Sequence, residues 1–374
     1  MLYPVMPLYL QSIGFSVVLI GILEGVAEAT IGLSKGYFGK RSDLIGKRVP
    51  FVQFGYALSV IAKPLLILFT NTLWVFFTRT LDRLGKGIRT GARDALLSDE
   101  ASPQTKGRVF GFHRSMDTLG AVLGPAIALV YLHFNPTSYK TLFLITIIPG
   151  VVVILITFLL KEKKKEKMNV SGSGSFASFL GYWKESPAMY RRVVVGLLAF
   201  ALFNSSDVFL LLKLKDSGLT DTAVIGVYIF YNLIYAILAF PMGVLADRIG
   251  VRKTFVLGLT LFAITYIGMS FKADIYIFLV LFACYGGFYA ATEGIAKAWI
   301  SNIASKDDTA TAIGFYSGFQ SIALLVASSM AGLIWYSFGA GYTFLITGLA
   351  AVGVMVYFLL MKSSSVVSTT LNDQ

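Results

Sequence analysis

The chain alternates between long hydrophobic runs and short polar segments. Eleven runs are each long enough to cross a bilayer, which takes about 20 apolar residues in a helix. Lipid cannot satisfy free backbone N–H and C=O groups, and the runs are too long and uniform for barrel strands, so we expect transmembrane helices. Their predicted ranges are 16–38, 49–70, 72–92, 108–133, 141–160, 190–212, 221–243, 254–271, 275–299, 309–336 and 340–361.

A polar segment divides these helices into two groups. Residues 161–179, KEKKKEKMNVSGSGSFASF, combine a lysine run with a Gly/Ser stretch, which is typical of a solvated linker. We therefore predict an N-terminal transmembrane bundle at 1–160, a linker at 161–187, a C-terminal bundle at 188–362 and a tail at 363–374.

The distribution of basic residues predicts the orientation. If the linker is cytoplasmic, 24 of the 32 Lys and Arg residues fall on its side, four lie in the opposite loops and four lie within spans. The positive-inside rule then places the linker on the cytoplasmic side of a multi-pass cell (plasma or inner) membrane protein. The net charge of +12 is explained by anionic lipid rather than by nucleic acid.

Composition supports a membrane protein and argues against an enzyme. Hydrophobic residues make up 56% of the chain, against about 45–50% in soluble proteins, and the mean hydropathy is +0.73. The lone Cys284 excludes a disulfide framework and a cysteine-based metal site. We find no nucleotide loop, no metal cluster around His113 and His133, and no Ser/His/Asp arrangement, so we expect no cofactor and no metal.

Two loops in equivalent places of the two halves resemble each other. GKRSDLIGKRVPF (39–51) and GVLADRIGVRKTF (243–255) share a glycine, an aspartate four residues on, a second glycine and a basic pair. A short basic turn is common in membrane proteins, but two matching copies favour an internal repeat. The matched positions are Gly39, Asp43, Gly46, Lys47 and Arg48 with Gly243, Asp247, Gly250, Arg252 and Lys253.

This loop resembles the signature G-x-L-A-D-R-x-G-R-K of the major facilitator superfamily (MFS). Gly243 to Lys253 follow it closely, whereas the first copy departs from it at Arg41 and Leu44. RTLDRLG (79–85) is similar to the family's R-x-x-Q-G-x-G element in helix 4, with Asp82 and Arg83 as departures. GAVLGP (120–125) is similar to the G-x-x-x-G-P element of exporters and antiporters, and the whole chain resembles an efflux-like prokaryotic subgroup.

The resemblance implies an all-α membrane protein with two six-helix bundles related by a pseudo-twofold axis and with both termini in the cytoplasm. Residues 1–13 would then be the outer part of a truncated first helix, and the bundles would rock about a substrate near the bilayer midplane. Asp43 and Asp247 can cap the N-termini of neighbouring helices and hold an inner gate shut. The expected gating residues are Gly39, Asp43, Gly243, Asp247, Arg248, Gly250, Gly120, Gly124 and Pro125.

Charged residues recur inside the predicted spans of the first half. Arg79, Asp82 and Arg83 fall near mid-membrane, where an ion costs about 2.5–3.5 kcal/mol. We expect Glu24, Glu28, Asp82 and Asp117 to balance Lys63, Arg79, Arg83 and Arg114 in an ion-pair network. The network either locks helices 2 to 5 together or contains a carboxylate that gains and loses a proton. We expect Arg89, Arg93 and Asp94 to be solvated near the cytoplasm.

The second half carries fewer polar residues within its spans. FNSSDVF places Asn204 and Asp207 in the seventh helix, and Tyr285, Tyr289 and Glu293 share one face of the tenth. Glu293 has the alternative of pairing with Lys297 one turn away. The candidate substrate and proton-coupling residues are Arg79, Asp82, Arg83, His113, Arg114, Asp117, Glu24, Glu28, Asn204, Asp207, Tyr289 and Glu293.

Three hypotheses for function remain open. The first is a proton-coupled exporter of a small organic compound, acting as a monomeric antiporter in the lipid bilayer. The second is an importer or symporter of an anionic metabolite, which the basic stripe of residues 79–93 favours. The third is a non-transporting sensor on the same fold. The sequence does not identify the substrate.

Overall fold

The computed structural model describes residues 6, 9–10, 13–15, 17–135, 138–160, 180–219, 221–271 and 274–361. These residues are almost entirely helical, and no strand occurs among them. The predicted first-helix fragment 1–13, the segment 161–179 and the tail 363–374 lie wholly or mostly outside the described residues.

The helices of the first half match the predicted spans. They are α2 (Val17–Ile45), α3 (Val49–Leu68), α4 (Thr72–Asp99), α5 (Lys106–Phe134), and the consecutive α6 (Tyr139–Ile145) and α7 (Ile147–Thr157). Helix α4 runs seven residues beyond the predicted end at 92, so its charged C-terminal turns remain helical.

The second half begins with the short α8 (Tyr182–Glu185) and ends with α15 (Ala340–Leu360). The predicted seventh span is divided at Leu202–Asp207 into α9 (Ala188–Ala201) and α10 (Val208–Asp216). The remaining helices are α11 (Asp221–Ile249), α12 (Val251–Met269), α13 (Ile275–Ile303) and α14 (Thr309–Phe338). Each of the eleven predicted spans thus coincides with one helix or with two consecutive helices.

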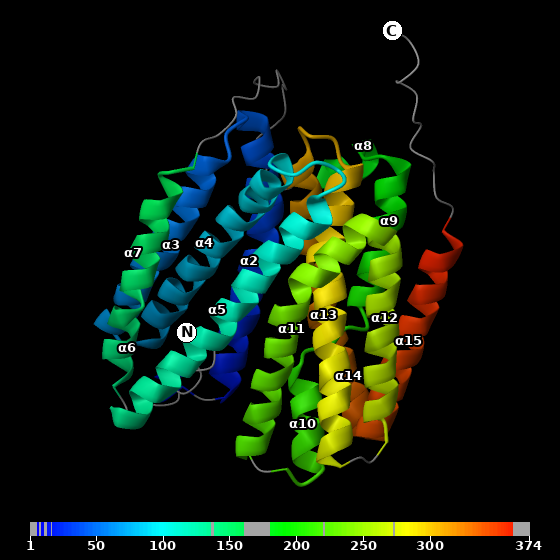
Figure 1. Ribbon diagram of the computed structural model, residues 1–374. Coiled ribbons are helices and arrows are strands. Elements are labelled where there is room, and N and C mark those ends of the chain that lie inside the picture. The colour runs from blue at the N-terminus through cyan, green and yellow to red at the C-terminus, as the bar shows by residue number, and fades with distance from the viewer. Residues whose placement is uncertain are drawn as a thin grey trace.

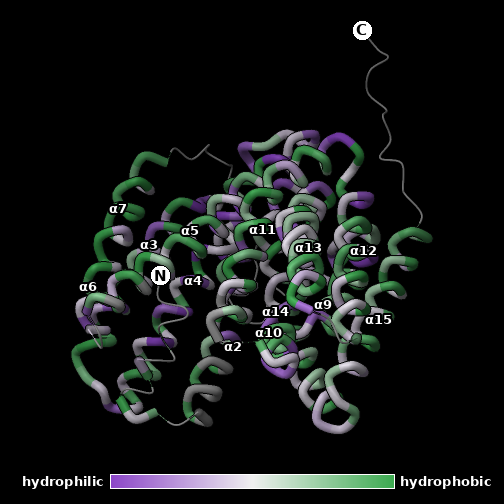
Figure 2. The backbone as a smooth tube through the Cα atoms, turned by 60° about the horizontal axis from the view of Figure 1, so that its bottom comes forward, coloured by the Kyte–Doolittle hydropathy of each residue, from purple (hydrophilic) through white to green (hydrophobic). Residues whose placement is uncertain are grey.

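Eight helical stretches within the described residues are long and apolar enough to cross a membrane. Helix α4 is not among them, because charged residues recur along most of its length. Large apolar side chains such as Leu73, Leu333 and Tyr336 are exposed on the outside of the bundle, as expected for a surface that faces lipid. The outer helices α7 and α15 are mostly hydrophobic in Figure 2.

The molecule consists of two helical bundles that stand side by side (Figure 1). Helices α2–α7 pack among themselves, as do α9–α15, and the main contacts between the bundles are α5 with α11 and α2 with α14. In chain order α11 is the counterpart of α2 and α14 the counterpart of α5. The two contacts are therefore exchanged by a pseudo-twofold axis, as predicted.

We call the end of the molecule where α2 finishes and α8 lies the linker end; it is the upper end in Figure 1. Both repeat loops lie there, and each turns at a glycine in the left-handed region. Gly46 has φ 67° and Gly250 has φ 98°. An L side chain avoids this region, so the glycines shared by the two loops have a conformational cause.

Replacing the turn glycine of the second loop should destabilise the protein. Gly250 has φ 98° and ψ 141°, so Gly250→Ala should lower the free energy of unfolding by about 1–3 kcal/mol. Thermal unfolding of the purified protein in detergent measures the change. The control Gly226→Ala replaces a glycine inside α11 where a Cβ has open space. Equal midpoints for the two variants would contradict a conformational role for Gly250.

Candidate functional site

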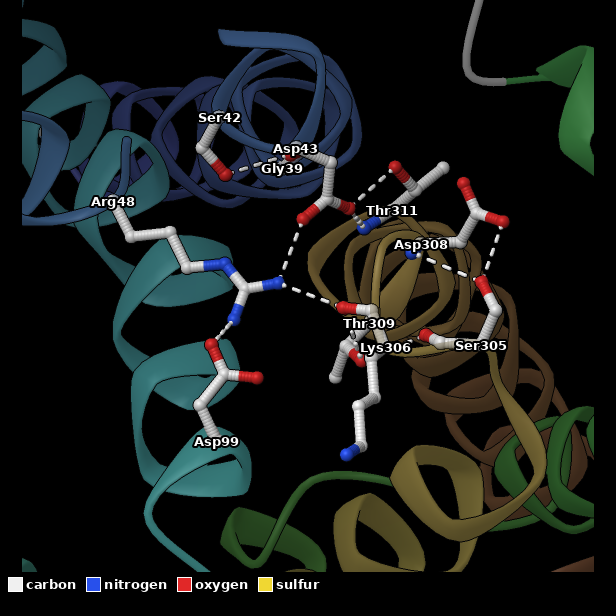
Figure 3. A network of polar contacts seen from close by, with 10 residues as sticks. All are labelled: Gly39, Ser42, Asp43, Arg48, Asp99, Ser305, Lys306, Asp308, Thr309 and Thr311. Atoms are coloured by element: carbon white, nitrogen blue, oxygen red, sulfur yellow. Dashed lines mark hydrogen bonds and ion pairs between the residues drawn. The ribbon is translucent and has the colours of Figure 1, made fainter. Parts of the chain in front are cut away.

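Asp43, near the C-terminus of α2, caps the first turn of α14 in the opposite bundle (Figure 3). Its Oδ2 accepts hydrogen bonds from the backbone N–H of Thr311 at 2.7 Å and from the Thr311 hydroxyl at 2.8 Å. Arg48 donates to the other carboxylate oxygen at 3.0 Å and to the Lys306 carbonyl at 3.2 Å, and it also pairs with Asp99. One buried carboxylate thus joins the two bundles at the linker end.

Asp247, near the C-terminus of α11, makes the symmetry-related contact. Its two carboxylate oxygens accept the backbone N–H groups of Gly107 and Arg108, each at 2.7 Å. These N–H groups belong to the first turn of α5, where they have no partner within the helix. In both halves, therefore, an aspartate of one bundle compensates the positive N-terminal end of a helix in the other.

Glycines let the backbones touch beside both caps. A Cβ built on Gly39 would lie 2.6 Å from the Ala310 carbonyl oxygen of α14, and one built on Gly107 would lie 2.6 Å from the Gly243 carbonyl oxygen. A Cβ on Gly120 would instead meet nothing within 4 Å. Gly124 and Pro125 follow in α5, farther from the linker end, and Arg248 is exposed at the end of α11.

Arg114 of α5 lies between the bundles and contacts both. Its guanidinium reaches Asp117 of its own helix at 3.2 Å and Glu293 of α13 at 3.8 Å, and its Nε donates to the Tyr235 hydroxyl of α11. The side chain of Asp117 is 51% exposed, whereas that of Glu293 is 27% exposed. The cation therefore has one carboxylate partner in each half, and the one in its own half is accessible to water.

A second ion pair crosses the interface one turn nearer the linker end. Lys297 of α13 lies 2.7 Å from Asp94 of α4, whose side chain is fully buried and also contacts Arg93 at 3.2 Å. Glu293 and Lys297 therefore each pair with a residue of the first half, Glu293 with Arg114 and Lys297 with Asp94. His113 lies within electrostatic range of Asp94 and Asp117.

The expectation of solvated side chains is wrong for Asp94, whereas Arg89 and Arg93 are partly exposed. Asp94 is buried between two cations. The Arg89 guanidinium lies 4.3 Å from the ring centre of Tyr56 and donates to Ser59. The helical face shared by residues 82–93 was visible in the sequence, but partners on α3 and α13 were not.

The other charged candidates of the first half lie on α2 and α4. Arg79 and Arg83 are buried, and Arg79 lies 3.7 Å from Asp82 within α4. Glu28 is exposed and, like Asp117, lies within electrostatic range of Lys86. The side chain of Glu24 lies outside the described part of the structure.

Asp207 of the second half is held by tyrosines. Its carboxylate accepts hydroxyl hydrogen bonds from Tyr231 at 2.5 Å, Tyr285 at 2.7 Å and Tyr289 at 2.8 Å. These donors come from α11 and α13, so Asp207 ties the divided seventh span to both helices. Asn204 is buried three residues before it.

Cations outnumber acids in the seam between the bundles. Lys35, which the sequence did not single out, lies within electrostatic range of Lys86, Lys297, Asp94 and Glu293. Among the described residues, no group of three or more His, Cys, Asp or Glu side chains is arranged to hold a metal ion. The cations of this central seam are Lys35, Lys86, Arg89, Arg93, Arg114 and Lys297, and its acids are Glu28, Asp94, Asp117 and Glu293.

Comparison with known proteins decides the family. The model of the Major Facilitator Superfamily matches residues 1–231 and 212–372. The chain belongs to the major facilitator superfamily. An uncharacterized MFS-type transporter of Methanocaldococcus jannaschii is 31% identical over 367 residues, covering 96% of this chain and 90% of that protein. As an MFS protein, the chain is a multi-pass membrane transporter and not an enzyme.

Two further proteins, one relative and one solved structure, are also similar to the chain. The staphyloferrin B transporter of Staphylococcus aureus is 27% identical over 238 residues, which cover 60% of this chain and 56% of that protein. The crystal structure of the human organic anion transporter MFSD10 superposes with a TM-score of 0.75 at 14% identity, covering 94% of this chain and 88% of that one. The latter likeness shows the MFS fold alone.

A bulky side chain at the α5–α11 contact should force the linker end of this MFS protein open. We expect Gly243→Leu to lengthen the distance between spin labels at Gln104→Cys and Asp307→Cys in a Cys284→Ala background, because the backbones touch at Gly243. Double electron–electron resonance measures that distance.

Gly120→Leu is the matched control, since it adds the same side chain to α5 where a Cβ has open space. It should leave the distance unchanged. A Gly243→Leu protein with an unaltered distance distribution would show that this contact does not hold the linker end closed.

Proposed function

We propose that the protein is a proton-coupled secondary transporter that exports a small organic anion by alternating access. The observation that carries this proposal is Arg114, which contacts Asp117 and Glu293 at the interface of the two bundles. When one of two carboxylates that share a cation takes up a proton, its charge is lost and the cation becomes free to bind an anionic substrate group.

The charge of the seam supports an anionic substrate. Its six cations exceed its four acids, and Lys86 is exposed although it lies on an inward-facing stretch of α4. Arginine and lysine side chains in a partly dehydrated site bind carboxylate, sulfonate or phosphate groups with charge-assisted hydrogen bonds.

The contacts between the bundles indicate which conformational state of the transport cycle the structure represents. In the described part of the chain, the hydrogen bonds and ion pairs that join the halves lie in the linker-side portions of α2, α4, α5, α11, α13 and α14. With the linker in the cytoplasm, as the basic residues predict, this state is closed toward the cytoplasm. An exporter releases substrate in that state and receives protons from outside.

Glu293 is the carboxylate we assign to coupling, because it pairs across the interface. A proton on Glu293 removes the charge that holds Arg114 to α13 and so weakens the closed linker end. The linker end then opens, the proton leaves to the cytoplasm, and an organic anion takes the place of the carboxylate beside the cations. Return to the closed state re-forms the Arg114–Glu293 pair, which displaces the anion to the outside.

The protein should bind anions in preference to cations. In a thermal-shift screen we expect mono-, di- and tricarboxylates or arenesulfonates to raise the unfolding midpoint, and quaternary ammonium compounds not to. Lys86→Gln should weaken binding of an anionic hit about tenfold. Lys215→Gln, on the exposed end of α10, is the control. Stabilisation by cationic compounds alone would contradict the proposal.

Glu293→Gln should separate substrate exchange from proton coupling. In proteoliposomes, uptake of the anionic hit driven by an imposed pH gradient should fall to background, while exchange of labelled for unlabelled substrate should persist. Arg114→Ala should lose both activities, and Asp216→Asn, at the exposed end of α10, should keep both. Gradient-driven uptake that survives in Glu293→Gln would rule out this carboxylate as the coupling group.

A further inference from the structure

The seventh span is interrupted at a polar segment inside the membrane. Helix α9 ends at Ala201 and α10 begins at Val208, and the sequence between them is LFNSSD. Asn, Ser and Asp favour such breaks because their side chains compete for backbone hydrogen bonds. The carbonyls of Leu202, Asn204 and Ser205 accept no backbone hydrogen bond in the described structure. The break therefore presents carbonyl oxygens that no backbone N–H satisfies.

Asp207, at the end of this break, lacks a cationic partner. The contacts of its carboxylate are the hydroxyl groups of Tyr231, Tyr285 and Tyr289. Among the described residues, no Lys or Arg forms an ion pair with it. By contrast, Asp94, Arg114, Glu293 and Lys297 each lie close to an opposite charge. Three neutral donors stabilise a carboxylate but leave its charge uncompensated.

Buried oxygen atoms without partners lie in the same segment. Asn204 is 8% exposed and Ser205 is 3% exposed, and Asn204 Oδ1 has no hydrogen-bond partner. Ser205 Oγ and the Tyr266 hydroxyl meet no strict hydrogen-bond criterion but lie close enough to interact with each other, and the Tyr266 hydroxyl also lies close to that of Tyr285, so Asn204 Oδ1 is the clearest unpaired oxygen. Tyr266 also lies within electrostatic range of Asp207. A buried polar atom left unpaired is costly, so each of these oxygens is a candidate ligand.

We propose that this break binds a sodium ion. The available ligands are hard oxygens: one carboxylate, an amide, hydroxyls and freed carbonyls. One negative charge matches a monovalent cation, whereas a calcium site usually gathers several carboxylates. The C-terminal end of α9 points its carbonyl dipoles at the same place and also favours a cation. The ion would neutralise the charge of Asp207 and be coordinated by the side-chain oxygens of Asn204 and Ser205.

The proposed sodium site is connected to the central seam through two tyrosines. Tyr289 donates to Asp207, and its ring stacks on that of Tyr235 with centroids 5.3 Å apart and planes 24° apart. The Tyr235 hydroxyl in turn accepts from Arg114. A sodium ion at Asp207 can thus restrict Tyr289 and, through the ring contact, Tyr235, which binds Arg114. Sodium binding itself does not depend on which substrate the seam carries.

The test is sodium binding to the full-length protein in lipid nanodiscs without substrate. We expect saturable binding of ²²Na⁺ and a rise in the unfolding midpoint with NaCl that equal concentrations of choline chloride or KCl do not give. Asp207→Asn should abolish both effects, and Asn204→Ala should weaken sodium binding about tenfold. Ser206→Ala, an exposed neighbour in the same segment, should bind sodium like the parent protein.

Several outcomes would overturn the sodium site. Stabilisation equal in sodium, potassium and choline would show an ionic-strength effect only. Undiminished ²²Na⁺ binding in Asp207→Asn would place the ion elsewhere. Stabilisation that follows pH and is indifferent to sodium would make Asp207 a proton site. None of these results bears on Arg114 and Glu293, whose variants test the transport proposal separately.

Discussion

The structure depends on a single electrostatic constraint, which is that an ion inside a bilayer needs an opposite charge or a strong donor beside it. The chain meets this constraint partly within its first half and partly by two ion pairs across the contact between its halves. Arg114 pairs with Glu293 and Lys297 pairs with Asp94, and each pair has one member in each bundle. These two ion pairs therefore both make their charges tolerable and join the bundles at the linker end. To open that end, the protein must replace each lost partner with water, a proton or a substrate group, which ties conformational change to ligand exchange.

The two aspartate caps also hold the bundles together at the linker end, but each contributes less free energy than a buried ion pair. Asp43 and Asp247 each bind the first turn of a helix in the opposite bundle, and an interaction of a carboxylate with a helix N-terminus contributes about 0.3–1 kcal/mol. Such contacts can break and re-form on a functional timescale, whereas a fully buried ion pair loses several kcal/mol when one partner is removed. The caps therefore bias the equilibrium without fixing it. The touching glycines beside them make the closed geometry specific, because the helix backbones meet directly there.

The sequence predicted the helices and the repeat well and predicted their partners poorly. A long apolar run indicates that a helix is surrounded by lipid. For this reason all eleven spans could be predicted from the sequence. The repeat loops need glycine at a left-handed turn, so Gly46 and Gly250 reveal the internal symmetry. By contrast, Asp94 was expected to be solvated and is fully buried. The prediction failed because its partner Lys297 is far away in the chain. A helical face can be read from spacing, but the surface that it meets depends on how two bundles dock. The break at Leu202–Asp207 was also missed, since its flanks are apolar enough to suggest one continuous span.

The two halves are alike in topology and unlike in chemistry. The first half contributes most of the cations of the seam, whereas the second contributes a large aromatic core and the tyrosines around Asp207. Two bundles with identical linings would present the same charges, and both halves would then bind ligands of the same sign. Here the cationic wall is suited to an anion, and the tyrosine-lined carboxylate is suited to a cation. Tyr289 and Tyr235 connect these opposite sites by direct contact, so a change at Asp207 has a physical route to Arg114. Because a ligand shifts a conformational equilibrium only through its different affinities for the two states, these two sites are the places where such differences can arise.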